Sequence, residues 1–270
     1  MDIYKQQNRS LFPLIRLSQG QLNLLETCPV QFQRIYFEQL NTPSSPSQQE
    51  KQTWGSQFHL LMQQRELGLP IDELLSDDDQ LNHSLSALLQ VAPELQQNNP
   101  DTWRSAEHCR TLEFQGYLFT VIYDLIIANS TQAHILDWKT YLQPEKPAKL
   151  ANNWQTRLYL YVLAETSNYL PEQISMTYWF VKLPTQPQKI IFNYDRHQHE
   201  QTRQDLIRLL TQLDEWIKNY LEKNISFPHR EDCLEKCPYA EILLDTQDES
   251  KNDNNRVFSI DEIAEINPFL

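Results

Sequence analysis

The stretch from Tyr123 to Lys139, YDLIIANSTQAHILDWK, contains two apolar runs separated by the polar segment Asn129–Gln132. Runs rich in β-branched residues on either side of a short polar segment are typical of a β-hairpin. If the turn is centred in the middle of that segment, the numbers of facing residues sum to 261, so Asp124 faces Asp137. The Cβ atoms of such a pair lie about 5 Å apart. The sequence therefore predicts two opposed carboxylates on neighbouring strands.

These carboxylates and Lys139 form a group of charges in an apolar part of the sequence. Asp137 and Lys139 are two positions apart, so their side chains point to the same face of a strand. The apolar residues that flank the group, and that predict a covered central sheet, are Ile122, Leu125, Ile126, Ile127, Ile135 and Leu136. Opposed carboxylates in a dry setting are costly unless compensated. A divalent cation held by both aspartates would compensate them. The alternative is a partly buried Asp124–Lys139 ion pair, with Asp137 at an exposed strand end.

The pattern along the rest of the chain predicts an α/β fold, although residues 1–16 carry no clear pattern. We expect a central mixed β-sheet of about four or five strands flanked by helices, with a helical N-terminal part. The helices are expected from Ser18, where Gln21 completes a capping box, from Thr53, over 70–100, over 149–167 and over 197–223. The strands are expected over 112–127, 134–140, 174–183 and 189–194. The expected domain organisation is one domain over 1–244, with a helical part at about 17–105, a core at about 106–225, a cysteine segment at 226–244, and a disordered acidic tail at 245–270.

The composition of the chain argues against several classes of function. The chain has 270 residues and a net charge of −13, which argues against nonspecific coating of nucleic acid or of anionic membrane, although a local basic cleft stays possible. Only 4 residues are glycines, too widely spaced for a phosphate-binding loop. No apolar run is long enough to cross a membrane, and the first residues do not resemble a signal peptide. We therefore expect a cytoplasmic protein.

The ordered motifs resemble a known family. Asp124, Asp137 and Lys139 on a hairpin are followed by the helical motif Gln155-Thr156-Arg157-Leu158-Tyr159. They are preceded by Cys28-Pro29-Val30-Gln31-Phe32 and by Gly55-Ser56-Gln57-Phe58-His59. This set is similar to the PD-(D/E)XK nuclease superfamily, and specifically to its RecB-like exonuclease branch, which includes CRISPR-associated exonucleases and the AddB nuclease domain. The resemblance implies a restriction-endonuclease-like core.

The resemblance also implies roles for individual residues. Mg²⁺ or Mn²⁺ would be held by His59, Asp124, Asp137 and the Trp138 carbonyl, and an imidazole ligand favours tolerance of Mn²⁺. Lys139 would position the attacking water and stabilise charge on the phosphate.

Three further residues are candidates for the same site. Gln155 and Tyr159 share a helical face and would border the site, and Glu107 matches an acidic residue of some members. The alternatives are a helix-flank role for His59, core packing for Tyr159, and exposed positions for Gln155 and Glu107. The chain departs from the family at Val121 and Ile122, where a glycine is usual.

The function implied is that of a metal-dependent DNA nuclease in repair, recombination or defence. We expect an exonuclease or a single-strand-directed enzyme, acting on DNA that is single-stranded or has free ends, with a helicase or other protein subunit as a candidate partner. The alternative is a catalytically degenerate nuclease-fold subunit that binds DNA or a protein. A zinc hydrolase is disfavoured, because the sequence has no His-x-x-x-His or His-Glu-x-x-His motif.

The cysteines raise a separate question. Some RecB-like nucleases hold a [4Fe–4S] cluster with four cysteines, and only Cys28, Cys233 and Cys237 match that set. Because such a cluster normally takes four thiolates, we do not expect an intact one. His229, Cys233 and Cys237 are spaced to share a helical face and, with Cys28, offer a zinc set. We expect instead that these cysteines pack as small apolar groups.

Overall fold

In the computed structural model, the chain is built around a six-stranded mixed β-sheet. The structure describes residues 14–40, 46–76, 78–96, 100–183, 186–230, 233 and 237. The strands are β1 (Ile15–Leu17), β2 (Trp103–Phe114), β3 (Tyr117–Ala128), β4 (Ala133–Lys139), β5 (Ile174–Phe180) and β6 (Gln188–Asn193). Their order is β1-β3-β4-β5-β6, and β2 also pairs with β3. The β4–β5 pair is parallel, whereas β2–β3, β3–β4 and β5–β6 are antiparallel. The expected mixed α/β fold is confirmed.

The β3–β4 hairpin has the register that the sequence predicts. Leu125 pairs with Leu136, and Ala128 pairs with Ala133, so facing residue numbers sum to 261. The Asn129 side chain closes the turn, because its Oδ1 accepts the Thr131 N–H at 2.9 Å and the Gln132 N–H at 3.0 Å. This is the local Asx hydrogen bonding that makes asparagine favourable in turns. The hairpin therefore brings the two aspartate positions to facing places, one step beyond the last paired residues.

The start of the sheet differs from the expectation. The run 112–127, expected as one strand, contains a tight turn at Gln115 and Gly116, whose φ angles are 53° and 78°. Two consecutive positive φ angles make the type I′ turn that suits a two-residue hairpin, and Gly116 adopts this conformation without steric cost. The run is therefore divided between β2 and β3, and β1 and β2 bring the number of strands in the sheet to six.

The helices follow the expected order, but the helices expected from Ser18, over 70–100 and over 149–167 are each divided. They are α2 (Gln19–Thr27), α3 (Pro29–Tyr36), α4 (Pro46–Glu66), α5 (Asp72–Ser76), α6 (Asp79–Val91), α7 (Pro147–Asn152), α8 (Trp154–Glu165) and α9 (Arg196–Lys223), with 3₁₀ turns at Pro93–Leu95 and Pro171–Gln173. The helix expected over 149–167 is two helices, α7 and α8, separated at Asn153. The Asn153 backbone is extended, and its side chain accepts the Gln155 N–H at 2.8 Å to cap α8.

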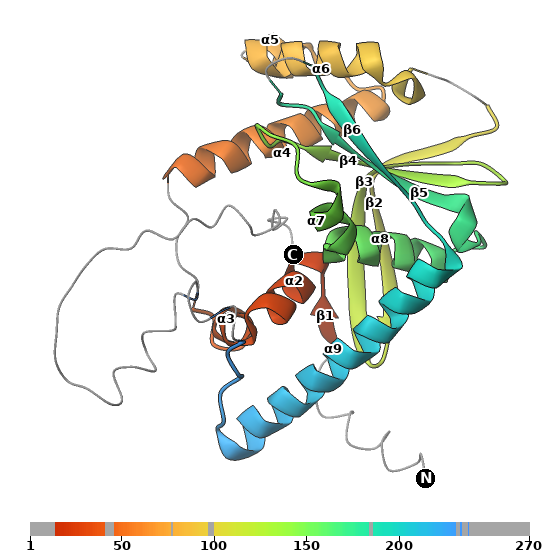
Figure 1. Cartoon of the computed structure of the whole chain (residues 1–270). Helices are drawn as coiled ribbons and strands as arrows, with labels where there is room; N and C mark the ends of the chain where they lie inside the picture. Colours follow the sequence, from red (N-terminus) through yellow and green to blue (C-terminus); the bar gives the residue numbers. More distant parts are fainter. Residues whose placement is uncertain are drawn as a thin grey trace. The chain divides into compact units, whose positions relative to one another are not determined.

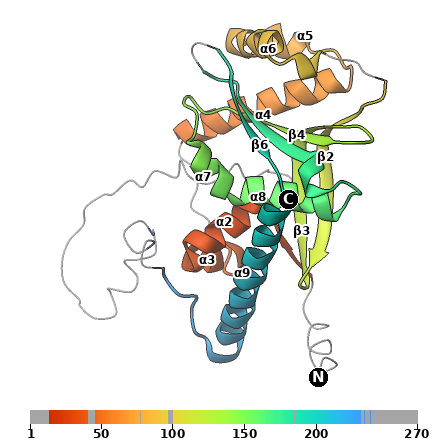
Figure 2. The same cartoon turned by 45° about the vertical axis from the view of Figure 1, so that its right-hand side comes forward.

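The two faces of the sheet are covered by different helices. Trp54, Phe58 and Leu61 of α4 pack with α6 against sheet residues that include Leu136 and Trp138. Figure 1 shows strands of the sheet between α4 (orange) and α8 (green), and the turned view of Figure 2 agrees. Because neighbouring residues of a strand alternate between faces, the side chains on either side of Trp138 point away from α4, towards α8. The charged residues of β4 are therefore held on the α8 side.

The described residues group into two compact units, one within Met1–Arg16 and Ser44–Arg203 and the other within Leu17–Pro43 and Gln204–Leu270. The expectation of one domain over 1–244 stays a prediction, and the expected tail at 245–270 lies outside the described residues. No helix in the described part of the chain is both long and apolar enough to span a lipid bilayer.

Candidate functional site

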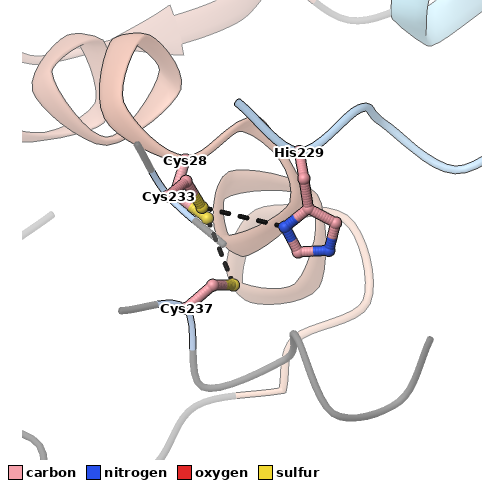
Figure 3. A group of neighbouring side chains, drawn as sticks. All are labelled: Cys28, His229, Cys233 and Cys237. Carbon is pink, nitrogen blue, oxygen red and sulfur yellow. Dashed lines mark hydrogen bonds between the residues drawn. The ribbon is translucent and has the colours of Figure 1, made fainter. Parts of the chain in front are cut away.

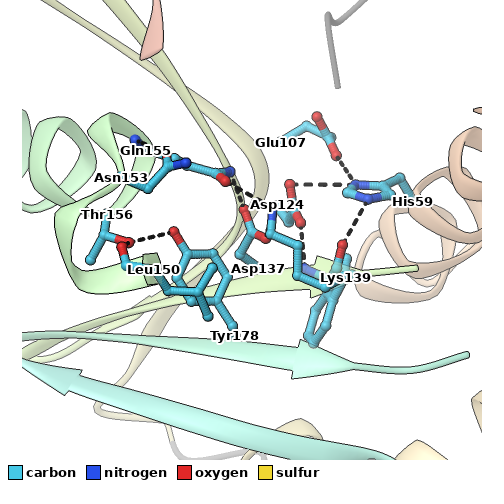
Figure 4. A network of polar contacts seen from close by, with 11 residues as sticks. His59, Glu107, Asp124, Asp137, Lys139, Leu150, Asn153, Gln155, Thr156 and Tyr178 are labelled. Atoms are coloured by element: carbon cyan, nitrogen blue, oxygen red, sulfur yellow. Dashed lines mark hydrogen bonds and ion pairs between the residues drawn. The ribbon is translucent and has the colours of Figure 1, made fainter. Parts of the chain in front are cut away.

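A buried group of three side chains joins β4 to α8. The Lys139 ammonium lies 2.8 Å from Asp137 Oδ1, and both side chains are almost fully buried, with exposed fractions of 7% and 2%. The Gln155 side chain bridges them, because its Oε1 accepts from Lys139 Nζ at 2.8 Å and its Nε2 donates to Asp137 Oδ2 at 2.7 Å (Figure 4). Gln155 thus holds the ion pair from the helix side, and the alternative that it is merely exposed is wrong.

A second group lies beside the first, on β2, β3 and α4. The His59 imidazole is central: its Nδ1 lies 3.4 Å from Asp124 Oδ1 and 3.9 Å from Glu107 Oε1. Its Nε2 lies 3.2 Å from the Trp138 carbonyl oxygen. One potential ligand atom from each of His59, Glu107 and Asp124 falls within 4.8 Å of the others. Figure 4 shows all three side chains converging on one point beside β4.

The backbone of Glu107 is unusual. Its neighbours Ala106 and His108 pair with Leu125 and Tyr123, which places Glu107 opposite Asp124, yet Glu107 itself takes no part in the ladder. Its φ angle is +48°, a conformation that costs a non-glycine residue about 1–3 kcal/mol. The interruption leaves the Glu107 carboxylate beside His59, which strengthens its place in this group.

Asp124 is fixed by the backbone of the neighbouring strand. Its Oδ2 accepts the Trp138 N–H at 2.7 Å, at the place where the β3–β4 ladder has ended. Its Oδ1 is left to face the imidazole of His59. The two aspartates expected to face each other are therefore held differently, Asp124 by the backbone of β4 and Asp137 by Lys139 and Gln155.

The site accumulates negative charge away from water. Burial, together with the Asp124 charge, raises the pKa of Glu107 to about 7. Burial also raises the pKa of Asp137 to about 6, although the Lys139 ammonium opposes this rise. Raised carboxyl pKa values mean that the ionised site is electrostatically unfavourable as it stands. A bound cation would compensate this negative charge.

Aromatic and hydroxyl groups support the charged residues from below. The Tyr178 ring lies under the Lys139 ammonium, 5.1 Å from its centroid, and its hydroxyl is 2.8 Å from Thr156 Oγ1. Thr156 in turn donates to the Leu150 carbonyl at 2.6 Å. Tyr159 is buried, its ring packs edge-on against Tyr123, and burial raises its pKa well above the ordinary range.

Tyr178 and Thr156 are not among the site residues predicted from the sequence. Tyr178 stands beside Asp137 because β5 pairs with β4 in parallel, a long-range pairing that no local pattern indicates. A usable signal for Thr156 exists, since it follows Gln155 directly on a helix already assigned to the site. The fold brings all eight residues expected at the site into one region of the sheet. They are His59, Glu107, Asp124, Asp137, Trp138, Lys139, Gln155 and Tyr159.

The residues present fit a divalent cation. Asp137 Oδ1 is buried, and its partner is the Lys139 ammonium at 2.8 Å. Carboxylate and carbonyl oxygens with one imidazole nitrogen form a donor set that suits Mg²⁺ or Mn²⁺. Glu107, Asp124, His59 and the Trp138 carbonyl supply the closely spaced donors, and Asp137 adds a carboxylate oxygen on the α8 side.

One family model and two solved structures are similar to the chain. The family model described as PD-(D/E)XK nuclease superfamily matches residues 16–242. None of the curated proteins is detectably similar to the chain in sequence. A crystal structure from Eubacterium rectale, named "putative exonuclease", is 11% identical with a TM-score of 0.53, covering 94% of this chain and 96% of that one. A second structure, named SSO0001, is 12% identical with a TM-score of 0.35, covering 83% and 84% of the two chains.

The likeness to the Eubacterium rectale structure concerns the fold alone, because the identity is low. The family model is more informative, because it spans most of the chain and includes β3, β4 and α8, which build the site. On this match, the chain belongs to the PD-(D/E)XK nuclease superfamily.

Proposed function

We propose that the chain is a metal-dependent deoxyribonuclease that hydrolyses phosphodiester bonds at the site formed by β3, β4 and α8. Nucleases of this superfamily use divalent metal ions, and the donor set described above fits such an ion. The observation that carries the proposal is the buried Asp137–Lys139–Gln155 group beside His59 and Asp124. Retaining a lysine and three carboxylates in a largely dry site is costly for a purely structural protein.

Each residue has a role that its position supports. Asp124, Asp137, Glu107, His59 and the Trp138 carbonyl would hold Mg²⁺ or Mn²⁺. When bound, that ion would act as a Lewis acid and lower the barrier to attack on phosphorus.

Lys139 would stabilise the charge that develops on the phosphate oxygens, because its ammonium is fixed before the reaction begins. Gln155 keeps the ammonium in place through Oε1 and orients Asp137 through Nε2. Tyr178 and Tyr159 exclude water beneath these groups, which strengthens every charge interaction in the site.

We propose further that the enzyme is an exonuclease or acts on single-stranded DNA, as the RecB-like motifs at Gly55–His59 and Gln155–Tyr159 suggest. The name of the Eubacterium rectale structure is in line with this preference. A role in repair, recombination or defence, and a helicase or other subunit as partner, stay predictions. The acidic total charge implies that any DNA contact is local to the site.

The test is digestion of labelled DNA by the full chain with Mn²⁺ or Mg²⁺. We expect Lys139→Ala to lower the cleavage rate by about 10²-fold or more, the usual effect of removing a preorganised charge from the transition state. Lys189→Ala is the matched control, because Lys189 is an exposed lysine on β6. Circular dichroism of both variants checks that the fold is retained.

The outcomes separate the candidate functions. Cleavage by Lys139→Ala at the wild-type rate would rule out hydrolysis by this site. DNA binding without cleavage by the wild type would support the non-catalytic subunit instead. Comparing linear single-stranded DNA with covalently closed circles tests the exonuclease preference, since an exonuclease leaves closed circles intact.

A further inference from the structure

A cluster of sulfur and nitrogen ligands lies in the second compact unit, apart from the residues of the proposed nuclease function. It is made by Cys28, His229, Cys233 and Cys237, and one ligand atom from each falls within 4.8 Å of all the others. The three cysteine side chains are buried, and the imidazole of His229 is half-buried. Figure 3 shows the four side chains converging from two segments that lie about 200 positions apart in the sequence.

The expected single helix through these ligands is not present in the described residues. Residues 224–230 have no regular secondary structure, Cys233 is in a 3₁₀ conformation and Cys237 has none. Cys233 N–H donates to the Arg230 carbonyl at 3.0 Å, and Cys237 N–H donates to the Cys233 carbonyl at 2.8 Å.

Both sides of the cluster are positioned by the fold. Cys28 lies at the junction of α2 and α3, where its N–H donates to the Leu24 carbonyl at 2.7 Å and its carbonyl accepts from Phe32 at 3.1 Å. On the other side, Phe227 N–H donates to Gln33 Oε1 at 2.6 Å. The aromatic side chains that pack around Phe227 are Phe32, Phe37, Trp216 and Tyr220. His229 follows two residues after this anchor, so its approach to Cys28 is built into the fold.

The distances indicate ligands of one ion rather than a disulfide. Cys28 Sγ lies 3.3 Å from Cys237 Sγ, well beyond the length of about 2.05 Å of an S–S bond. None of Cys28, Cys109, Cys233 and Cys237 is in a disulfide. Cys233 Sγ lies 3.7 Å from His229 Nδ1. A zinc ion with bonds of about 2.3 Å to sulfur and about 2.0 Å to nitrogen holds two tetrahedral sulfur ligands about 3.8 Å apart, and a sulfur and a nitrogen about 3.5 Å apart. The observed separations lie close to these values.

The same distances disfavour an iron–sulfur cluster. In a [4Fe–4S] cluster each cysteine binds a different iron, so the whole cluster holds the sulfurs apart. Here the ligand atoms lie too close together to surround such a group. A set of three thiolates and one imidazole is, by contrast, one of the ordinary structural zinc sets.

We infer that Cys28, His229, Cys233 and Cys237 bind one structural Zn²⁺ ion, which ties the segment after α9 to the α2–α3 junction. The bound ion would add to the Phe227 anchor, since the free energy of metal binding contributes to folding. The expectation that the cysteines only pack as small apolar groups does not account for the imidazole directed at Cys233 (Figure 3).

The test is metal analysis of the full chain, purified without chelator. We expect about one zinc per chain in the wild type and a fall to under about 0.2 in Cys233→Ser and His229→Ala, because a tetrahedral site needs all four ligands. Cys109→Ser is the matched control, since Cys109 is an exposed, free cysteine on β2, and it should keep its zinc. Replacement by Co²⁺ should give the visible spectrum of a tetrahedral thiolate site in the wild type and in the control.

Treatment with a chelator gives a second readout, which can be made on the wild type itself. A strong zinc chelator should lower the unfolding temperature of the wild type and of Cys109→Ser. Zinc-free wild-type protein that takes up neither Zn²⁺ nor Co²⁺ would overturn the inference. So would iron with acid-labile sulfide, or equal loss of zinc from Cys109→Ser. None of these readouts depends on nuclease activity.

Discussion

The substitution Glu107→Gln tests the electrostatics of the candidate active site most directly. Burial and the Asp124 charge raise the pKa of Glu107 from 4.5 to about 7. A pKa raised in the folded state stabilises the protein below pH 4.5, and that stabilisation is lost as the pH rises through 7. The shift corresponds to about 3 kcal/mol. Because the Glu107 side chain is 26% exposed, solvent screens part of this interaction. We therefore use about 2 kcal/mol as the destabilisation caused by the ionised carboxylate.

Removing the charge should therefore stabilise the metal-free protein at high pH. We expect Glu107→Gln to raise the free energy of unfolding by about 2 kcal/mol at pH 8 and by less than about 1 kcal/mol at pH 5. Urea denaturation in EDTA measures both values. Mn²⁺ should then stabilise the wild type more than the variant, since the variant has lost a carboxylate ligand.

Glu113→Gln is the control, because Glu113 is an exposed glutamate on the same strand and its replacement should change stability by no more than about 0.5 kcal/mol. An equal gain for Glu107→Gln at the two pH values would show that carboxylate repulsion is not the cause. A loss of stability at pH 8 would show that the Glu107 carboxylate is favourable where it lies, and the electrostatic reasoning would be wrong.

Three further substitutions test the surroundings of the site. Thr156→Val should lower the free energy of unfolding in urea by about 1–3 kcal/mol, because it leaves the buried Tyr178 hydroxyl without its Thr156 partner and removes one of two hydrogen bonds to the Leu150 carbonyl; a neutral effect would contradict these bonds. His59→Gln should weaken Mn²⁺ binding more than Mg²⁺ binding in calorimetry, since the imidazole suits Mn²⁺ better; equal losses would argue against ligation by His59. Asn153→Ala should cost about 1 kcal/mol by removing the α8 cap, whereas Asn153→Asp should cost less, and equal costs would exclude capping as the cause.

Local patterns were sufficient for the β3–β4 hairpin. The Asn129 turn and the two apolar runs determine the register by themselves, so Leu125 pairs with Leu136 as predicted. The hairpin at Gln115 and Gly116 was missed, although Gly116 was a visible turn signal, because the apolar character continues through the turn. Strand β1 has only three residues, too few to show a period.

The sequence by itself determined the family, the α/β order and the charged residues of β4, because hydrophobic period, turn chemistry and motif spacing are local properties of the chain. Tertiary structure alone decided which groups meet those charges. The parallel β4–β5 pairing brings Tyr178 beneath Lys139, and the positive φ of Glu107 brings its carboxylate to His59. The tertiary structure also brings Cys28 close to His229, Cys233 and Cys237, which lie about 200 positions later in the sequence. Such contacts depend on long loop closures, whose energy comes from packing of the whole fold and leaves no periodic trace in the sequence.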